Sequence, residues 1–458
     1  MILLLSVVLA SVHSFPTVSP LLPSIDGSRD RHRILLLSDS STSSWDDLQE
    51  QFSTNLAAPF PVSIDTVLHP LEPSSFSTVR PTLFRERHGW CPYSERVWLA
   101  LEMFNIDYDT IRIDNTGGPR PSYYTGGQTP QILWPETTRR QGESMDLIRE
   151  IDQRYCHGAL QSDASLVQNT IAQFQTIFPR ARPSSRAAFL FQNNGEPLWR
   201  RTFEQTLQAT DALLASTTSG PFFCGDTITA ADLAWVPFLE RYRYQLPCLH
   251  PGLTPDDPTE YPHLSAWYTA METQIPAYVC RIQGDASSWR KVLTMAGYGN
   301  AGVPPDIEHS IQELQRAEAR AAEEESRNHA NQKLSLWKEY QSTRPHVADT
   351  PAAEAAGIMY RNRDAIVQDI VQKRSSALTK RKTFLPDSLD SESIDRALRQ
   401  LIQVLLRLDE QEQVLDEQMI SSVGWLAAFL DERMCVPRDM GAMSAACIKG
   451  IARYQQRI

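Results

Sequence analysis

The sequence predicts a small α/β domain followed by an all-α domain and an additional all-α extension. Three observations support this prediction. Residues 81–157 alternate between strand-like and helix-like patterns, in the order β-α-β and then β-α. Beyond residue 165 the strand patterns disappear and apolar residues recur at helical spacing up to about residue 300. From about residue 303 to residue 458 the helical spacing continues, with a composition rich in Ala, Glu, Arg and Leu.

Length and composition agree with about three folded units. The chain has 458 residues, and domains average roughly 150 residues. Hydrophobic residues make up 41% and charged residues 22% of the chain, which excludes wholesale disorder. The formal net charge of −11, without a long basic stretch, argues against a nucleic-acid-binding protein. The seven cysteines form no CxxC or CxxH pair, so neither a disulfide scaffold nor a metal site is expected.

Residues 1–14 predict a signal peptide, and residues 15–80 predict a presequence or linker that is mostly disordered. The apolar run at residues 2–10 is too short to span a bilayer and suits the core of a signal peptide, although no basic residue precedes it. A disordered apolar tail is the alternative. The following segment is rich in Pro, Ser and Thr. Short elements near residues 34–37 and 45–52 are candidates for docking on the folded part.

A signal peptide followed by Phe15 and a Ser/Pro-rich segment resembles the bipartite presequence of proteins sent to secondary plastids in algae. This resemblance implies a plastid location, although Asp26, Asp30, Asp46 and Asp47 are unusual in a transit segment. Secretion or retention in the endoplasmic reticulum is the alternative. The chain is not expected to be an integral membrane protein.

Three strands and two helices are expected in the α/β domain. We expect a strand at residues 82–87, a helix that begins after Cys91, a strand at 108–113, a strand at 128–134 entered through Pro130, and a helix after Glu143.

Cys91 is the residue with the clearest chemical signal. Pro92 suits the first position of a helix, which places Cys91 at the N-cap. Free N–H groups and the helix dipole stabilise a thiolate there, so the sequence predicts a pKa below the roughly 8.5 of a free thiol. An inert buried cysteine is the alternative. Ser94 stands where a dithiol oxidoreductase carries its second cysteine, so a resolving thiol must come from outside.

Residues 91–144 resemble the cysteine-type branch of the glutathione S-transferase superfamily, which includes the omega, lambda and iota classes. The resemblance rests on the CPYS tetrapeptide, the Thr-Pro step before a strand and the Glu-Ser pair that opens a helix. It implies a thioredoxin-like fold with Cys91 as the catalytic residue and glutathione as co-substrate. It also implies that Thr129, Pro130, Glu143 and Ser144 bind glutathione, Pro130 through a cis peptide bond. Arg120 is a candidate for an additional basic contact.

Residues 165–300 predict the helical domain of the same superfamily. Thr229 and Asp232 have the spacing of a capping box, so Asp232 is expected to stabilise a helix start rather than to catalyse. Aromatic side chains between the two halves are candidates for the second-substrate site, but core packing is the alternative and none is assigned: Phe189, Phe191, Trp199, Tyr242, Tyr244 and Trp267. Cys224, Cys248 and Cys280 are expected to be core residues.

Residues 303–458 resemble the C-terminal extension of iota-class transferases, through the segments at 359–366 and 429–440. We expect a long exposed helix at 307–340, a second helix at 358–371, an amphipathic helix over 394–415 and helices at 423–430 and 447–454. Charged residues of the two segments are expected to form ion pairs, with an anion site as the alternative: Arg361, Arg363, Asp364, Arg438 and Asp439.

Together these features predict a glutathione-dependent thiol transferase or reductase that uses one cysteine thiolate on a small or protein thiol or electrophile. Deglutathionylation and reduction of dehydroascorbate or a quinone belong to this reaction class. A non-catalytic glutathione-gated binding module is one alternative. A glutathione-conjugating transferase that uses Tyr93 or Ser94 is another. A homodimer is compatible with the sequence.

Overall fold

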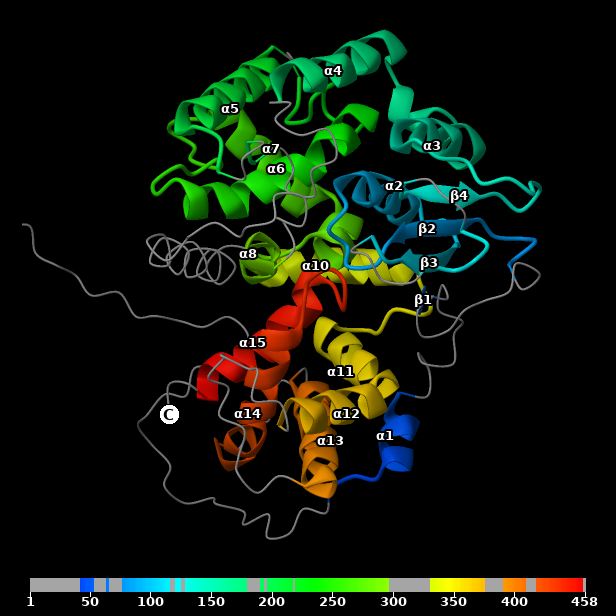
Figure 1. The fold of residues 1–458 in the computed structure, drawn as a ribbon, viewed down its shortest axis with the longest axis vertical. Helices are drawn as coiled ribbons and strands as arrows, with labels where there is room; N and C mark the ends of the chain where they lie inside the picture. The colour runs from blue at the N-terminus through cyan, green and yellow to red at the C-terminus, as the bar shows by residue number, and fades with distance from the viewer. Residues whose placement is uncertain are drawn as a thin grey trace, which may run out of the picture.

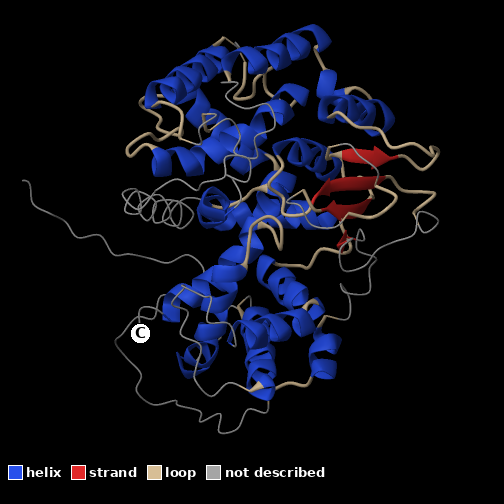
Figure 2. Cartoon of the chain, viewed as in Figure 1, coloured by secondary structure: helices blue, strands red, loops and turns tan. Residues whose placement is uncertain are grey.

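The computed structural model describes residues 42–52, 63–65, 76–115, 120–124, 128–178, 190–192, 196–216, 219–295, 330–374, 390–408 and 417–455. The predicted signal peptide, the element at 34–37 and Phe189 lie outside the described residues, as does most of the predicted helix at 307–340. The strands gather on one side of the upper part of the molecule, and helices make up the rest (Figures 1 and 2).

A four-stranded sheet forms the thioredoxin-like half. Its order is β1-β3-β2-β4, with β1 and β2 parallel to β3 and β4 antiparallel to β2. The strands are β1 (Ser63–Asp65), β2 (Thr82–Glu86), β3 (Asp109–Ile113) and β4 (Gln131–Leu133). The helices α2 (Pro92–Met103) and α3 (Ser144–Ile151) follow β2 and β4. The three predicted strands and two predicted helices are confirmed. Strand β1 was not predicted because three residues carry no readable alternation.

The helical half contains five α-helices among the described residues: α4 (Ala164–Ile177), α5 (Arg200–Ala215), α6 (Ala230–Leu249), α7 (Pro262–Gln274) and α8 (Ala286–Met295). Two π-helical turns, η2 (Asp152–Cys156) and η4 (Tyr278–Ile282), and the 3₁₀ turn η3 (Ala159–Gln161) complete it. Helix α6 continues through Pro237 and Pro247 to Leu249 with nearly all of its side chains buried, so tertiary packing overrides the helix-breaking tendency of proline.

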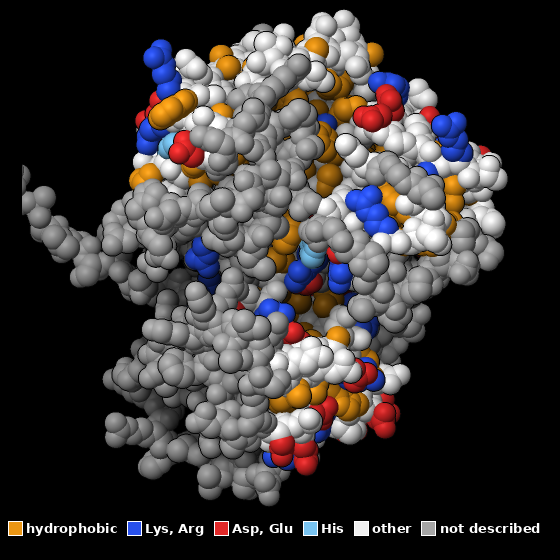
Figure 3. Space-filling view, in the orientation of Figure 1, with side chains coloured by type: hydrophobic (Ala, Val, Ile, Leu, Met, Phe, Trp, Pro, Cys, Tyr) orange, Lys and Arg blue, Asp and Glu red, His pale blue; other side chains and the backbone are white. Residues whose placement is uncertain are grey.

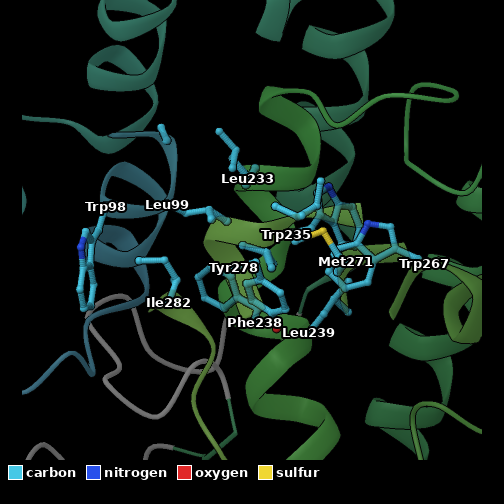
Figure 4. Close-up of a cluster of buried hydrophobic side chains, with 14 of the residues drawn as sticks. Trp98, Leu99, Leu233, Trp235, Phe238, Leu239, Trp267, Met271, Tyr278 and Ile282 are labelled. Carbon is cyan, nitrogen blue, oxygen red and sulfur yellow. The ribbon is translucent and has the colours of Figure 1, made fainter. Parts of the chain in front are cut away.

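The two halves share one apolar core. Figure 4 shows Leu99 of α2 pointing toward side chains of α6, α7 and η4, among them Phe238, Trp267 and Tyr278, while Trp98 lies on the other side of α2. All of these side chains belong to a single cluster of buried residues. The core therefore joins the helix that follows β2 directly to the centre of the helical half.

The C-terminal helices have a second core. They are α11 (Pro351–Arg361), α12 (Arg363–Arg374), α13 (Ser391–Arg407), α14 (Glu417–Arg433) and α15 (Ala442–Gln455). Ile394, Leu398, Leu401 and Leu405 of α13 are buried in it, as the amphipathic pattern predicted. The single helix expected at 358–371 is instead two helices, which meet at Asn362, and the first begins at Pro351 beneath the capping side chain of Thr350.

An early segment of the chain docks on this second core. Helix α1 (Trp45–Gln51) begins with a capping box formed by Ser44 and Asp47. Its Trp45 indole donates a hydrogen bond of 2.9 Å to the Asp395 carboxylate of α13, and Leu48 is fully buried. In Figure 1, α1 lies beside α13 in the lower part of the molecule. The candidate element at 45–52 therefore folds by packing against helices more than 300 residues away in sequence.

Helix α10 (Ala330–Ser342) lies at the junction of the two cores. Its Trp337 and Tyr340 are buried in the core of the transferase-like halves, so the described part of the predicted exposed helix has one buried face. Among the described residues, no helix is both long and apolar enough to cross a membrane.

Candidate active site

Cys91 lies where the sequence placed it, at the N-cap of α2 with Pro92 at the first helical position. Its side chain is partly exposed and its thiol is free. The Cys91 Sγ lies 3.6 Å from the Thr129 carbonyl oxygen, to which the thiol donates. The sulfur is therefore beside the loop that enters β4, as the predicted site requires.

The predicted direction of the Cys91 pKa is wrong. Burial raises the pKa of the Cys91 thiol above its ordinary value, and the nearby Glu86 carboxylate adds to this. Hydrogen bonds from the Ser94 hydroxyl and from the Ser94 and Tyr93 N–H groups lower the pKa but do not outweigh the burial. The sequence identified the helix N-terminus but not the cost of desolvating the thiolate between two packed halves.

Glu86 organises the loop that leads to Cys91. This buried carboxylate ends β2 and accepts hydrogen bonds of 2.7 Å from the backbone N–H groups of His88 and Trp90. The Glu86 N–H donates to the buried Ser94 hydroxyl at 3.3 Å. Glu86 thus fixes both sides of the turn around the cysteine. Sequence analysis missed it, although a carboxylate at the end of an apolar strand was a usable signal.

Thr129 and Pro130 face Cys91 across the site. The Thr129–Pro130 peptide bond is cis, as predicted from the resemblance. The Thr129 hydroxyl accepts a hydrogen bond of 2.8 Å from Asn115, whose side-chain oxygen accepts one of 2.6 Å from Arg120. Arg120 is therefore connected to the site through Asn115.

Glu143 and Ser144 open α3, as predicted. Glu143 is exposed and has a φ of +63°, a strained conformation for a residue other than glycine. Ser144 is buried, and its hydroxyl lies 3.4 Å from the Arg96 guanidinium, which donates to it. The charge of Glu143 and that of Cys91 both act on Tyr93. Tyr93 is thus close to both the cysteine and the start of α3.

Two buried arginines that the sequence analysis missed tie the site to the helical half. Arg96 of α2 donates hydrogen bonds of 3.0 and 2.6 Å to the Ala234 carbonyl of α6. Burial lowers the pKa of Arg96 to about 10. Arg241 of α6 forms a salt bridge of 2.7 Å with Glu95 and donates a hydrogen bond of 3.1 Å to the Trp90 carbonyl. In the sequence, each of these arginines directly follows a glutamate within a largely apolar helix, and this adjacent pair of charges was the available signal.

Several candidates turn out to be structural. Phe191, Tyr242 and Trp267 are core residues, whereas Trp199 is exposed. Asp232 caps α6 with Thr229, as predicted, and also accepts hydrogen bonds from the Phe223 N–H and the Trp267 indole. Cys248 and Cys280 are buried as expected, while Cys224 is partly exposed.

The charged residues of the extension form pairs, as expected, but not all with one another. Arg438 donates hydrogen bonds of 2.8 and 2.7 Å to Asp439. Arg361 pairs with Glu354 at 3.8 Å, and Arg363 lies over the rings of Trp45 and Tyr360. Within the described part of the chain, no group of His, Cys, Asp and Glu side chains is arranged to hold a metal ion.

Comparison with known families identifies both halves. Residues 90–154 match the glutathione S-transferase N-terminal domain and residues 168–270 match the glutathione S-transferase C-terminal domain. The chain thus carries the two domains of the glutathione S-transferase superfamily, whose members bind glutathione.

Similar proteins include "Protein IN2-1 homolog B" of Oryza sativa, which is 29% identical over 33% of this chain and 62% of its own length. "Glutathione S-transferase L3" of Arabidopsis thaliana is 24% identical over 39% of this chain and 72% of its own. The chain thus spans less than two thirds of the rice relative.

Two solved structures are also similar. Glutathione transferase Omega 3C from Trametes versicolor is 15% identical over 60% of this chain and 97% of its own, with a TM-score of 0.35. Dehydroascorbate reductase from Chlamydomonas reinhardtii is 20% identical over 53% of this chain and all of its own, with a TM-score of 0.30.

Proposed function

We propose that the protein is a glutathione-dependent thiol transferase or reductase that acts through Cys91. One observation carries the proposal: a partly exposed free cysteine at a helix N-cap lies 3.6 Å from the Thr129 carbonyl oxygen, with Ser94 in place of a second cysteine. This arrangement supports chemistry with one protein thiol and one external thiol.

The proposed first step is a thiol–disulfide exchange. The Cys91 thiolate attacks the glutathione sulfur of a glutathionylated substrate, a Cys91–glutathione disulfide forms, and the substrate leaves as a thiolate that takes up a proton. Because burial raises the Cys91 pKa, only a minor fraction is thiolate at neutral pH. A thiolate of higher pKa is a stronger nucleophile, which offsets part of that loss.

In the second step a free glutathione thiolate attacks the sulfur of the bound glutathione. Oxidised glutathione leaves, and Cys91 returns as a thiolate. The proposed binding groups are the backbone of Thr129 next to cis Pro130, for the cysteinyl part, and Glu143 with Ser144, for the γ-glutamyl end. The start of α3 offers free N–H groups to a carboxylate, and the Arg96 guanidinium beneath Ser144 adds positive charge.

Glutathione conjugation is the second candidate. It needs a hydroxyl that stabilises the thiolate of glutathione itself, and Tyr93 is the half-buried hydroxyl beside Cys91. Burial raises the Tyr93 pKa, so its hydroxyl remains a hydrogen-bond donor at neutral pH. Ser94 is less suited to this role because its side chain is buried and contacts the Glu86 N–H.

Replacement of Cys91 by Ser tests the mechanism. We expect at least a hundredfold loss of glutathione-dependent reduction of a glutathionylated peptide, because the exchange has no protein thiolate. Cys224→Ser is the matched control, since Cys224 is also partly exposed and free. Undiminished reduction by Cys91→Ser would refute the thiolate mechanism. Conjugation that survives in Cys91→Ser and disappears in Tyr93→Phe would support the second candidate. Glutathione binding without either reaction would support a binding module.

The proposed location is a plastid, reached through the signal peptide and the following segment, with secretion or the endoplasmic reticulum as the alternative. Expression of residues 1–80 fused to a fluorescent protein in a diatom would test it. Fluorescence outside the plastid would contradict the proposal.

A further inference from the structure

The connection between α14 and α15 contacts the loop that carries Cys91. This connection, residues 434–440, is called here the docking loop. Gly89 has a φ of +75°, and a Cβ added there would lie 3.7 Å from the Arg438 nitrogen and 3.9 Å from Pro437 Cδ. In Figure 1 the docking loop lies at the top of the lower helices, next to the loop between β2 and α2. Two segments about 350 residues apart in sequence therefore approach each other closely beside the active site.

Trp90, immediately before Cys91, is held from three sides. The Glu86 carboxylate accepts from its N–H at 2.7 Å, and Arg241 of α6 donates to its carbonyl at 3.1 Å. Its ring belongs to a small buried cluster with Trp289, Val292 and Cys435 of the docking loop. The thioredoxin-like half, the helical half and the extension each supply one of these contacts.

The docking loop is itself fixed to the helical half. The Val436 N–H donates a hydrogen bond of 2.7 Å to the Ser288 hydroxyl, and the Cys435 N–H donates one of 2.9 Å to Asp439. Gly441 follows the loop, and a Cβ there would overlap the Cys280 carbonyl oxygen at 1.8 Å. Only glycine permits this close approach of the two backbones, so the end of the docking loop is held in one position against Cys280.

The charges at this contact are complementary. The Arg438 guanidinium interacts with the Glu86 carboxylate that holds His88 and Trp90. Figure 3 shows Lys or Arg side chains and a histidine around a hollow near the junction of the upper and lower parts.

We propose that the docking loop positions Trp90 and Cys91, so that the C-terminal extension forms part of the active-site framework. This inference rests on the proposed function in giving Cys91 the reacting role. Cys435, Pro437 and Arg438 are positioning residues, because they act through Gly89 and Trp90. Displacing the docking loop exposes the turn before α2, which reduces the desolvation of the thiol and misplaces its sulfur.

The main test compares Gly441→Ala with Gly450→Ala in the full-length protein. The first change pushes α15 away from Cys280, whereas a Cβ at Gly450 of the same helix meets nothing within 4 Å. We expect Gly441→Ala to lower the pH midpoint of Cys91 alkylation by iodoacetamide, read by peptide mass spectrometry. We also expect turnover with a glutathionylated peptide to fall on the order of tenfold to a hundredfold. Gly450→Ala should change neither quantity.

Hydrogen exchange at residues 434–441 reports whether the docking loop has moved. Faster exchange there, with an unchanged alkylation midpoint and unchanged turnover, would overturn the proposal. The alkylation measurement needs no glutathione and no substrate, so it tests positioning even if the wild-type protein transfers no thiol. If the wild type were active and Gly441→Ala had the same turnover and alkylation midpoint, the proposed function would be supported and the positioning role of the docking loop would be refuted.

If Gly441→Ala fails to fold, Arg438→Gln is the second variant that tests the role of the docking loop. Burial lowers the pKa of the His88 imidazole, the Glu86 and Asp114 carboxylates raise it, and the positive charges of Arg438 and Arg87 lower it further. We therefore expect Arg438→Gln to raise the His88 pKa, followed by NMR, and to lower turnover. Arg433→Gln is the control, because Arg433 pairs with Asp369 at 2.8 Å instead. A His88 titration identical to that of the wild type would place Arg438 away from the active-site loop and refute the proposal.

Discussion

The contact between the thioredoxin-like half and the helical half differs from the contact between the extension and these two halves. The first contact is one continuous apolar core crossed by two buried arginines, Arg96 and Arg241. The extension has its own core, and its junction with the two halves combines apolar side chains of α10 in the first core with polar contacts. At this junction the Glu102 carboxylate accepts a hydrogen bond from Tyr340, and Lys449 pairs with Asp285.

Because of this difference, we expect the two halves to unfold as one unit, while the extension mainly positions the Cys91 loop. Two halves that share a core unfold together, because neither buries its apolar surface alone. An extension with its own core can lose its junction and still remain folded. The first contact therefore determines whether the site exists, and the second determines how precisely the Cys91 loop is held. Three substitutions test this distinction, in order of decreasing effect on stability.

Replacing Arg241 by Met should destabilise the protein most. It removes the partner of the buried Glu95 carboxylate and the donor to the Trp90 carbonyl. Breaking one side of a buried ion pair costs about 3–5 kcal/mol. Urea unfolding above pH 8, where Glu95 is ionised, should show this loss in one transition that includes both halves. Arg243→Met is the control, because Arg243 pairs with Asp256 and Glu272 inside the helical half at 15% side-chain exposure. If both variants lost the same free energy of unfolding, the Arg241–Glu95 pair between the halves would be no more important than a pair within one half.

Replacing Glu95 by Gln should alter the pH dependence of stability. Burial raises the Glu95 pKa from 4.5 to about 8, against the attraction of Arg241. A folded-state pKa above the unfolded value means that the folded state binds the proton more tightly. The contribution of Glu95 to stability is therefore complete below about pH 4.5 and is lost as the pH rises to about 8.

The free energy of unfolding of Glu95→Gln should accordingly fall less between pH 4.5 and 8 than that of the wild type. Denaturant titrations at several pH values measure this difference. Parallel curves for the two proteins would contradict the raised pKa.

Replacing Lys449 by Met should have the smallest effect and should act on the extension and its junction at Asp285. Burial would raise the pKa of Asp285, but the Lys449 ammonium lowers it below its usual value. Loss of this partly buried ion pair should cost on the order of 1 kcal/mol. Hydrogen exchange should accelerate in α14 and α15 before it accelerates in α2 and α6. Uniform acceleration throughout these helices would indicate a single cooperative unit. Arg396→Gln, which breaks an exposed pair within α13, is the control.

Much of the site could be predicted from local sequence. Cys91 before Pro92, Thr129 before Pro130 and the capping box at Thr229 and Asp232 depend on neighbours within a few residues. The contacts of Glu86 with His88 and Trp90 are also local, but they were missed because a carboxylate at a strand end has many possible partners. Arg241 could not be assigned, because its Glu95 partner lies 146 positions away.

The sequence by itself determined which residues begin α2, α3 and α6 and which cysteine stands beside the Thr129–Pro130 step. Local backbone geometry and side-chain capping act over one helical turn, so they are readable along the chain. Only the tertiary structure decided the direction of the Cys91 pKa, the docking of α1 on α13 and the contact of residues 434–440 with Gly89. These depend on desolvation and packing between distant segments, which the order of residues alone does not specify.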